Sequence, residues 1–349
     1  MKKVKWGILG TAGIARNFTV PGMKQADNCE LYAIAGRDLA RARAFADEFG
    51  FEKAYGSYEE LLDDPQVEAL YIPLPNHLHC EWVIKALDKK IPVLCEKPMG
   101  LTEEEDKAMF EAAERNGVPL MEAFAYLQSP YMEALKAEIA SGAIGEIVYI
   151  ESAFLEPQHE AENIRMRRDT MGGCLYDLGC YNTSFILTLM GREPKSVQAV
   201  STFSEQGVDI YTAALLDFGK PAAPPATDGS GASEGAPAIT RHAFAEFNCG
   251  MMLGVEGTDR FDRIDRVSIR GTKGWIESRT RFNQPGECRY TVCNDEGLRE
   301  ECVTVRQNYC LEIEQFGRVV TEGEAPKVTK DFTLMNARLI DRIHKVTGY

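Results

Sequence analysis

The stretch YIPLPNHLHCEWVIKALDKKIPVLCEKPMGLT, residues 71–102, contains the units that decide the fold. An apolar run ends at Pro73, an amphipathic helical pattern covers His77–Asp88, and a second apolar run, Pro92–Glu96, follows it. Two apolar runs joined by a helix are typical of a strand–helix–strand unit, in which the two strands lie parallel. The stretch therefore predicts an α/β protein with a parallel sheet, and it places Lys97 at the carboxyl end of a strand.

The same alternation extends on both sides of this stretch. The remaining apolar runs predict strands at Val4–Leu9, Glu30–Ala35, Val67–Pro73 and Pro119–Ala123. Helical patterns cover Leu39–Phe49 and Thr102–Asn116, and Thr102 with Glu105 forms a capping box at the start of the second helix. Residues 1–127 are thus predicted to form a doubly wound Rossmann domain.

The pattern changes after Gln128. A helix is predicted at Pro130–Ala140, a strand from Gly145 to Phe154, and a helical stretch from the Gly172-Gly173 turn to Met190. Alternating runs then follow one another at hairpin distances: Val197–Phe203, Ile210–Phe218, Ala243–Phe247, Met251–Glu256, Arg266–Arg270 and Gly274–Glu277. Residues 128–330 are therefore predicted to be a C-terminal α+β domain with an open, mainly antiparallel sheet. The segment 331–349 is predicted to be a helix, centred on Phe332–Val346.

One segment of the second domain has a distinct composition. Residues 219–238, GKPAAPPATDGSGASEGAPA, carry almost no large apolar side chain. The strand pattern resumes directly after it, so residues 219–239 are predicted to be a flexible insertion between two strands, not a domain linker.

Composition excludes several function classes. The 349 residues include 39 Lys and Arg against 53 Asp and Glu, which gives a formal charge of −14 and argues against nucleic acid or an anionic membrane as a partner. No apolar run approaches the roughly 18 residues that a membrane-spanning helix needs. The ten cysteines are scattered without a CxxC pair. They are interpreted as reduced packing thiols of a cytoplasmic protein without a bound metal.

A glycine-rich turn follows the first strand. Its residues Gly10, Thr11, Ala12, Gly13 and Ile14 lie where a dinucleotide pyrophosphate would meet the start of a helix. The middle place of the usual G-x-G-x-x-G/A pattern holds Ala12, with a glycine one position later. A tight strand-to-helix turn without a ligand would also favour glycine, so the motif alone leaves both interpretations open.

The end of the second strand bears on the choice of cofactor. The sequence Ala35-Gly36-Arg37-Asp38 places no acidic residue at the strand tip. The Arg37 guanidinium could bind a 2′-phosphate, which favours NADP over NAD, although NAD stays possible. The alternative is a solvated Arg37 at a helix start that Asp38 caps.

Three groups of residues resemble motifs of the Gfo/Idh/MocA oxidoreductases. Pro75 with His79 matches a PxxxH element, Glu96-Lys97-Pro98 matches an EKP signature, and GGCLYDLGCY, residues 172–181, resembles the motif GG-x-L-x-D-x-G-x-H/Y. The resemblance implies that Pro75, Asn76, His79, Glu96 and Lys97 contact the cofactor. It also implies Lys97, Asp177 and Tyr181 as catalytic residues.

Tyr181 stands where many family members have histidine. In this it is similar to the subgroup of glucose–fructose oxidoreductase, dimeric dihydrodiol dehydrogenase and NADP-dependent xylose dehydrogenase. An ammonium near Tyr181 would favour its phenolate, so Lys97 and Tyr181 make a sensible proton-handling pair. Without the resemblance, a buried aromatic residue on an apolar helix would be the preferred interpretation of Tyr181.

The chain departs from the family pattern after residue 122. Leu127 occupies a place where arginine often follows the aromatic residue, and Arg165, Arg167 or Arg168 are candidates to replace it. Tyr126, Arg165 and Asp177 are the expected substrate contacts.

These observations predict an NADP-dependent oxidoreductase. It would transfer a hydride between the nicotinamide and a carbinol carbon of a sugar, polyol or cyclic diol, without a metal. The resemblance further implies a homodimer or higher homo-oligomer that assembles through the C-terminal sheet. Two alternatives stay open: a glycosidase that uses tightly held NAD for transient oxidation, and a non-catalytic NADP-binding protein.

Overall fold

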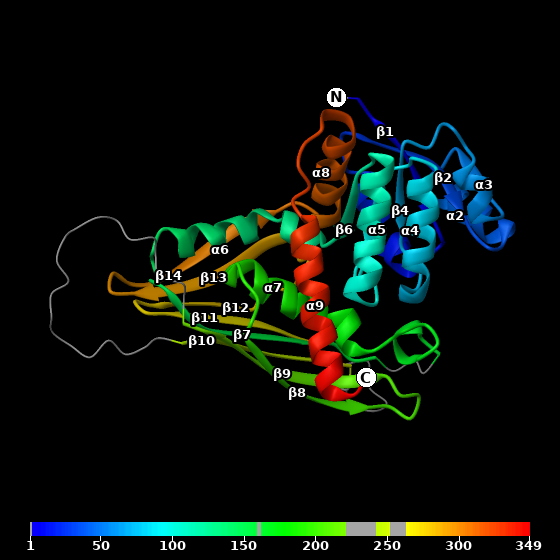
Figure 1. The fold of residues 1–349 in the computed structure, drawn as a ribbon. Coiled ribbons are helices and arrows are strands. Elements are labelled where there is room, and N and C mark those ends of the chain that lie inside the picture. Colours follow the sequence, from blue (N-terminus) through cyan, green and yellow to red (C-terminus); the bar gives the residue numbers. More distant parts are fainter. Residues whose placement is uncertain (1, 159–161, 221–241, 252–262) are drawn as a thin grey trace.

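A six-stranded parallel sheet and an eight-stranded mixed sheet organise the computed structural model, which describes residues 2–158, 162–220, 242–251 and 263–349 (Figure 1). The first sheet has the order β3-β2-β1-β4-β5-β6. Its strands are β1 (Val4–Leu9), β2 (Cys29–Ala35), β3 (Lys53–Tyr55), β4 (Ala69–Ile72), β5 (Val93–Glu96) and β6 (Leu120–Ala123). This is the doubly wound order whose direction reverses between β1 and β4, so the predicted Rossmann fold is confirmed.

Helices cover both faces of this sheet. They are α1 (Val20–Met23), which continues a π-helical turn η1 (Ala15–Thr19), α2 (Leu39–Phe49), α3 (Tyr58–Leu62), α4 (His79–Asp88) and α5 (Glu103–Asn116). Every residue of β4 and of β5 is buried, as expected for strands covered on both sides. Half of the predicted capping box is present: the Glu105 N–H donates to Thr102 Oγ1 at 3.2 Å, whereas Glu105 Oε2 accepts from the Leu101 N–H at 2.8 Å and not from that of Thr102.

The second sheet has the order β14-β13-β12-β11-β7-β10-β9-β8. Its strands are β7 (Ile147–Leu155), β8 (Ser196–Phe203), β9 (Asp209–Gly219), β10 (Ala243–Gly250), β11 (Ile264–Gly271), β12 (Trp275–Ser278), β13 (Gly286–Asn294) and β14 (Gly297–Val305). Among the described strands of this second sheet, β7 and β10 form the only parallel pair, and all other neighbours are antiparallel. The predicted mainly antiparallel sheet is therefore confirmed.

Helices lie on one face of the second sheet (Figure 1). They are α6 (Pro130–Ala140), α7 (Cys180–Met190) and α9 (Lys330–Thr347), the last matching the helix predicted for the end of the chain. On the described residues, the opposite face carries no helix. No helix of the described ranges is long and apolar enough to cross a bilayer.

Parts of the predicted pattern differ from the structure or lie outside it. The predicted strand Met251–Glu256, beyond its first residue, lies outside the described residues, as does most of the insertion 219–239. The hairpin of β13 and β14 and the helix α8 (Asn308–Glu322) were not predicted. A signal for the hairpin exists, because Cys288, Tyr290 and Val292 are buried while the residues between them are more exposed.

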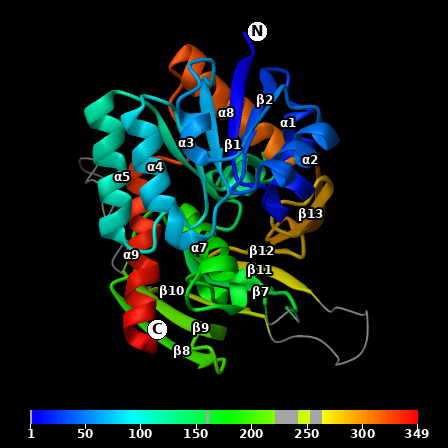
Figure 2. The ribbon, with the colours of Figure 1, turned by 90° about the vertical axis from the view of Figure 1, so that its right-hand side faces the viewer.

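Helix α8 returns from the C-terminal half to the first sheet. It packs against α1 and β2, and Figure 2 shows it beside β1. The rings of Trp6 on β1 and Phe316 on α8 lie 5.7 Å apart, and Asn28 Nδ2 donates to the Glu314 carbonyl at 2.9 Å. The chain therefore crosses between the two halves again near residue 308, and one apolar core runs through both.

Candidate active site

A cleft of about 850 Å³ lies at the carboxyl edge of the parallel sheet, within the size range of ligand pockets. The glycine-rich turn forms one wall, and Glu96 and Lys97 at the end of β5 form its floor. Of the predicted site residues, the cleft is lined by Ala12, Gly13, Ile14, Asn76, His79, Glu96, Lys97, Arg165, Asp177 and Tyr181. The fold thus brings most of the predicted site together from both halves of the chain.

Lys97 is held as a buried ammonium. Its side chain is 9% exposed, and Nζ donates to the Asp177 carbonyl oxygen at 2.6 Å and to Asp177 Oδ1 at 3.4 Å. Burial alone would lower the pKa of Lys97, but the neighbouring Cys180 sulfur and the carboxylates of Asp177 and Glu96 outweigh it, and the pKa is raised above its usual value. Lys97 is therefore a cation at neutral pH.

Asp177 is shared between two cations. Arg165 Nε donates to its Oδ2 at 2.6 Å, opposite the contact with Lys97. Burial would raise the pKa of Asp177, but Arg165 and Lys97 together lower it to about 2. The carboxylate therefore stays ionised and fixes the position of the Lys97 ammonium.

Tyr181 presents its ring, not its hydroxyl, to the ammonium. Lys97 Nζ lies over the ring at 4.6 Å from the centroid, a cation–π contact. Burial raises the pKa of Tyr181 well above its ordinary value, with the Glu96 carboxylate acting in the same direction. The expectation that the ammonium would favour the phenolate is therefore wrong in its net direction, and Tyr181 keeps its proton at neutral pH.

A buried carboxyl group fixes the helix start that carries Asp177 and Tyr181. Gly173 has φ +111°, and a Cβ there would meet Asp209 Oδ1 at 2.0 Å. Asp209 Oδ2 accepts from the Leu175 N–H and from Thr212 Oγ1, both at 2.9 Å. Because Gly173 has no side chain, the Asp209 carboxylate at the start of β9 can reach the Leu175 N–H. It thereby caps the π-helical turn η5 (Leu175–Gly179), which leads into α7.

The glycine-rich turn fits a dinucleotide. Gly10 has φ +109°, as a tight turn after β1 requires, and its N–H donates to the Ala35 carbonyl at 2.8 Å. Gly13 faces open space within the cleft, with no atom within 4 Å of the place a Cβ would take. The helix start is therefore open to a pyrophosphate at the position where backbone N–H groups favour anions.

The carboxyl end of β2 has an unpaired cation. Asp38 caps α2, since its Oδ1 accepts from the Ala40 N–H at 2.8 Å. Arg37 is exposed, and its guanidinium makes no ion pair within the described part of the chain. The Asp38 carboxylate is thus used to cap α2, whereas the Arg37 guanidinium is available to bind a phosphate.

Two other predicted cofactor residues also join chain segments. Both ring nitrogens of His79 face backbone carbonyls, Nε2 that of Leu74 at 2.7 Å and Nδ1 that of Pro98 at 2.9 Å. Asn76, which follows Pro75 at the end of the loop after β4, donates from Nδ2 to the Met171 carbonyl at 2.9 Å. These bonds hold the rim of the cleft and connect its two halves.

The predicted substrate contacts are placed differently. Arg165 lines the cleft, whereas Arg167 pairs with Asp169 and Arg168 lies over the Tyr349 ring. Tyr126 lies behind Tyr181, with ring centroids 5.7 Å apart, and its hydroxyl bonds to Ser184 Oγ at 2.8 Å. Of the three arginines considered, only Arg165 reaches the cleft.

Several cleft residues were not found from the sequence. Phe154 comes from β7, Phe282 and Asn283 from the loop between β12 and β13, and Tyr309 from the first turn of α8. Phe154 and Phe282 pack against the Tyr181 ring, with centroids 5.6 and 5.3 Å away. Aromatic side chains thus form much of the wall around the predicted catalytic phenol.

Two family profiles match the chain. The profile described as "Oxidoreductase family, NAD-binding Rossmann fold" matches residues 4–124, and the "GFO/IDH/MocA C-terminal domain" matches residues 132–224. The chain belongs to the Gfo/Idh/MocA oxidoreductase family. The family resemblance that the EKP and GG-x-L-x-D motifs indicated is therefore confirmed, and both motifs lie within the matched residues.

Named relatives of this Gfo/Idh/MocA chain are sugar and diol dehydrogenases. D-xylose 1-dehydrogenase (NADP(+)) 2 of Haloferax volcanii is 35% identical over 97% of this chain and 96% of its own. Trans-1,2-dihydrobenzene-1,2-diol dehydrogenase of Mus musculus is 37% identical over 62% of this chain and 65% of its own. A 3-ketoreductase from Actinomadura kijaniata, solved with NADP and TDP-benzene, is 25% identical over 99% of this chain and 98% of its own, with a TM-score of 0.85.

Buried carboxyl groups surround the floor of this Gfo/Idh/MocA site. Glu122, at the end of β6, accepts the Met99 N–H at 3.0 Å. Burial raises the pKa of Glu122 to about 7, and burial likewise raises the pKa of Asp106 and of Glu96. Among the described residues, no group of three or more His, Cys, Asp or Glu side chains is arranged to hold a metal ion.

The raised pKa of Glu122 makes stability depend on pH. Between the unfolded pKa near 4.5 and the folded pKa near 7, the folded chain binds more protons, so the free energy of unfolding should fall as pH rises. The stabilisation should be about 3 kcal/mol, fully present below about pH 4.5 and lost above about pH 7. Glu122→Gln should remove most of this slope in urea unfolding at pH 5 to 8. If the free energy of unfolding depends on pH equally in the variant and the wild type, the pKa of Glu122 is not raised in the folded chain.

Proposed function

We propose that the protein is an NADP-dependent oxidoreductase that moves a hydride between the nicotinamide and a carbinol carbon of a sugar, polyol or cyclic diol. The observation that carries the proposal is the pairing of a buried Lys97 ammonium with the protonated Tyr181 phenol, in the same cleft as the open glycine-rich turn. The named relatives support the substrate classes, because they act on xylose and on a cyclic dihydrodiol.

The residues of the cleft would divide the proton chemistry between them. NADP supplies or accepts the hydride when it is bound. During reduction, the Tyr181 hydroxyl donates its proton to the carbonyl oxygen of the substrate, and the Lys97 ammonium stabilises the phenolate that is left. During oxidation, the same phenolate oxygen takes the proton of the substrate hydroxyl. Asp177 and Arg165 hold the ammonium in place throughout.

The proposal is tested in two steps. Fluorescence titration with NADPH and NADH measures cofactor binding, and a screen of aldoses, inositols and dihydrodiols measures net formation of NADPH. Binding together with net NADPH formation is the expected result. Cofactor binding with no redox turnover of any of these substrates would contradict the proposal. Hydrolysis of a glycoside without net NADPH change would favour the glycosidase alternative.

The preference for NADP should depend on Arg37. Arg37→Ala should weaken NADPH binding by about tenfold, because an exposed guanidinium–phosphate contact is lost, and leave NADH binding unchanged. Arg115→Ala is a matched control, because this exposed arginine ends α5 at the opposite edge of the sheet, paired with Asp88. Equal loss of affinity for both cofactors in Arg37→Ala would show that the 2′-phosphate binds elsewhere.

We also propose a homo-oligomer formed through the C-terminal sheet. Its helix-free face carries Val200 on β8 and Leu215 on β9, both exposed. Sedimentation velocity would measure the mass in solution. The cytoplasmic location stays a prediction from composition.

A further inference from the structure

Two phenols, not one, line the cleft beside the predicted reaction centre. Tyr181 on α7 and Tyr309 on α8 are 9% and 7% exposed, and both belong to the cleft wall. Asn283 connects them: its Nδ2 donates to the Tyr181 hydroxyl oxygen at 3.2 Å and to the Tyr309 hydroxyl oxygen at 3.3 Å. The two phenol oxygens therefore lie within hydrogen-bond reach of a single nitrogen.

This arrangement determines where the phenol hydrogens go. An amide NH₂ group only donates, so neither hydroxyl can give its hydrogen to Asn283 Nδ2. Within the described ranges, each of these two hydroxyls accepts from Asn283 Nδ2 and donates no hydrogen bond to a protein atom. Each phenol oxygen is thus occupied as an acceptor from one side, and its hydrogen is left for a partner in the cleft.

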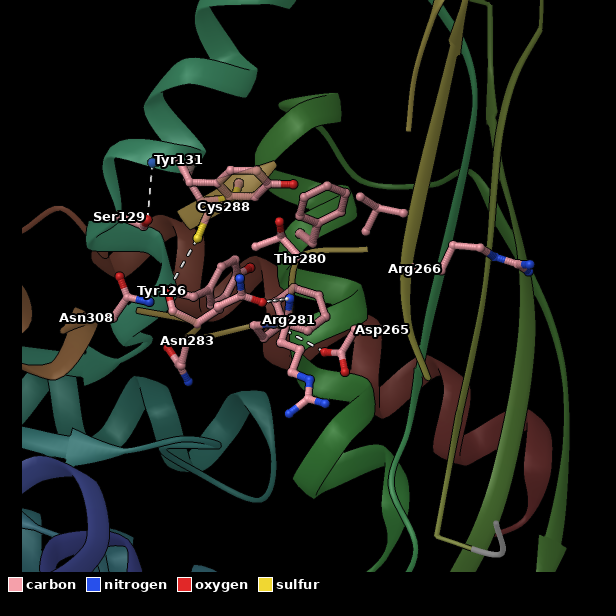
Figure 3. A pocket seen from close by; sticks show the side chains of 15 residues that line it. Tyr126, Ser129, Tyr131, Asp265, Arg266, Thr280, Arg281, Asn283, Cys288 and Asn308 are labelled. Carbon is pink, nitrogen blue, oxygen red and sulfur yellow. Dashed lines mark hydrogen bonds between the residues drawn. The ribbon is translucent and has the colours of Figure 1, made fainter. Parts of the chain in front are cut away.

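The loop that carries Asn283 is built to hold it. Asn283 adopts φ +60°, a left-handed conformation that asparagine tolerates better than most residues. On either side, the Arg281 N–H donates to Gln284 Oε1 at 3.1 Å and the Phe282 N–H donates to Asp265 Oδ1 at 3.2 Å (Figure 3). The position of the amide is therefore set by the loop backbone and not by the phenols alone.

We propose that Asn283 is a positioning residue that directs both phenol hydrogens into the cleft, and that the substrate carries a hydroxyl on the carbon next to the reacting carbon. The Tyr181 hydroxyl donates to the oxygen on the reacting carbon, and the Tyr309 hydroxyl donates to the oxygen of the neighbouring hydroxyl. The inference rests on the proposed function. A substrate without the second oxygen leaves the buried Tyr309 hydroxyl without a partner, which disfavours its binding.

The substrate part is tested with pairs that differ in one hydroxyl. The pairs are D-xylose with 2-deoxy-D-xylose and trans-1,2-cyclohexanediol with cyclohexanol, each oxidised by NADP. The wild type should prefer the first member of a pair by about tenfold in kcat/KM, and Tyr309→Phe should abolish that preference by losing activity on the first member alone. Equal losses on both members, or an unchanged preference, would overturn the inference. If the wild type oxidises no member with NADP or NAD, the proposed function itself fails.

The role of Asn283 is tested with two variants that tolerate its backbone conformation. Asn283→Gly removes the amide, and Asn283→Asp keeps its shape but replaces the donor with a charged acceptor. Asn283→Gly should lower kcat by about tenfold and weaken the preference for the adjacent hydroxyl, with an unchanged Tm. Asn283→Asp should be less active than Asn283→Gly. If Asn283→Asp keeps wild-type activity and preference, the phenols do not need the donor and the inference is wrong.

Discussion

Lys97→Met should lower kcat by about 10³-fold and change the Kd for NADPH by less than about threefold. The substitution keeps an unbranched side chain but removes the ammonium that lies over the Tyr181 ring. The phenolate formed during reduction would then have no cation beside it in a buried site, where charge is costly. Arg165 still pairs with Asp177 at 2.6 Å, so the pocket should keep its shape.

Stopped-flow kinetics and fluorescence titration of NADPH separate the two effects. Lys53→Met is a suitable control, because it removes an ammonium that pairs with Asp64 at 2.8 Å outside the cleft. The control should keep kcat within about threefold of the wild type. A Lys97→Met enzyme that turns over at the wild-type rate would exclude Lys97 from the chemistry.

Tyr181→Phe should lower kcat by about 10²- to 10⁴-fold in both reaction directions. Phenylalanine keeps the ring that packs against Phe124, Phe154 and Phe282, so Tm should stay close to that of the wild type. Asn283 loses one of its two hydroxyl partners but keeps Tyr309. The expected result is thus loss of the proton donor within an intact cleft.

Rate and Tm are measured together for this variant. Tyr131→Phe is the control, because it removes a buried hydroxyl on α6 outside the cleft. If Tyr181→Phe keeps more than about a tenth of the wild-type kcat, another group supplies the proton, and the Tyr309 hydroxyl is the next candidate.

The fold was predictable where local pattern and burial coincide. Strands β4 and β5 are buried throughout, so each appears as a continuous apolar run next to a helical pattern. Strand β3 has no buried residue, and β14 alternates exposed with half-buried side chains, so neither shows a strong apolar signal. Helix α8 was not predicted, although Ile313, Phe316 and Val319 recur at a helical spacing and are buried.

The candidate site was predictable in part. Recognisable sequence motifs contain Lys97, Asp177 and Tyr181, and the structure brings these three residues into one cleft. Asn283 and Tyr309 carry none, since their role comes from contacts between a loop and a helix that meet only in the folded chain. The upward shift of the Tyr181 pKa likewise depends on burial in the folded chain, which the local sequence pattern does not show.

The return of α8 to the first sheet has a consequence for synthesis of the chain. The apolar surface around Trp6 packs against Phe316, a residue that is made much later along the chain. The first half therefore leaves the ribosome with part of its core uncovered, and it completes its packing only after α8 has emerged. Because the same helix supplies Tyr309 to the cleft, completion of the cofactor domain and completion of the substrate wall both require the docking of α8.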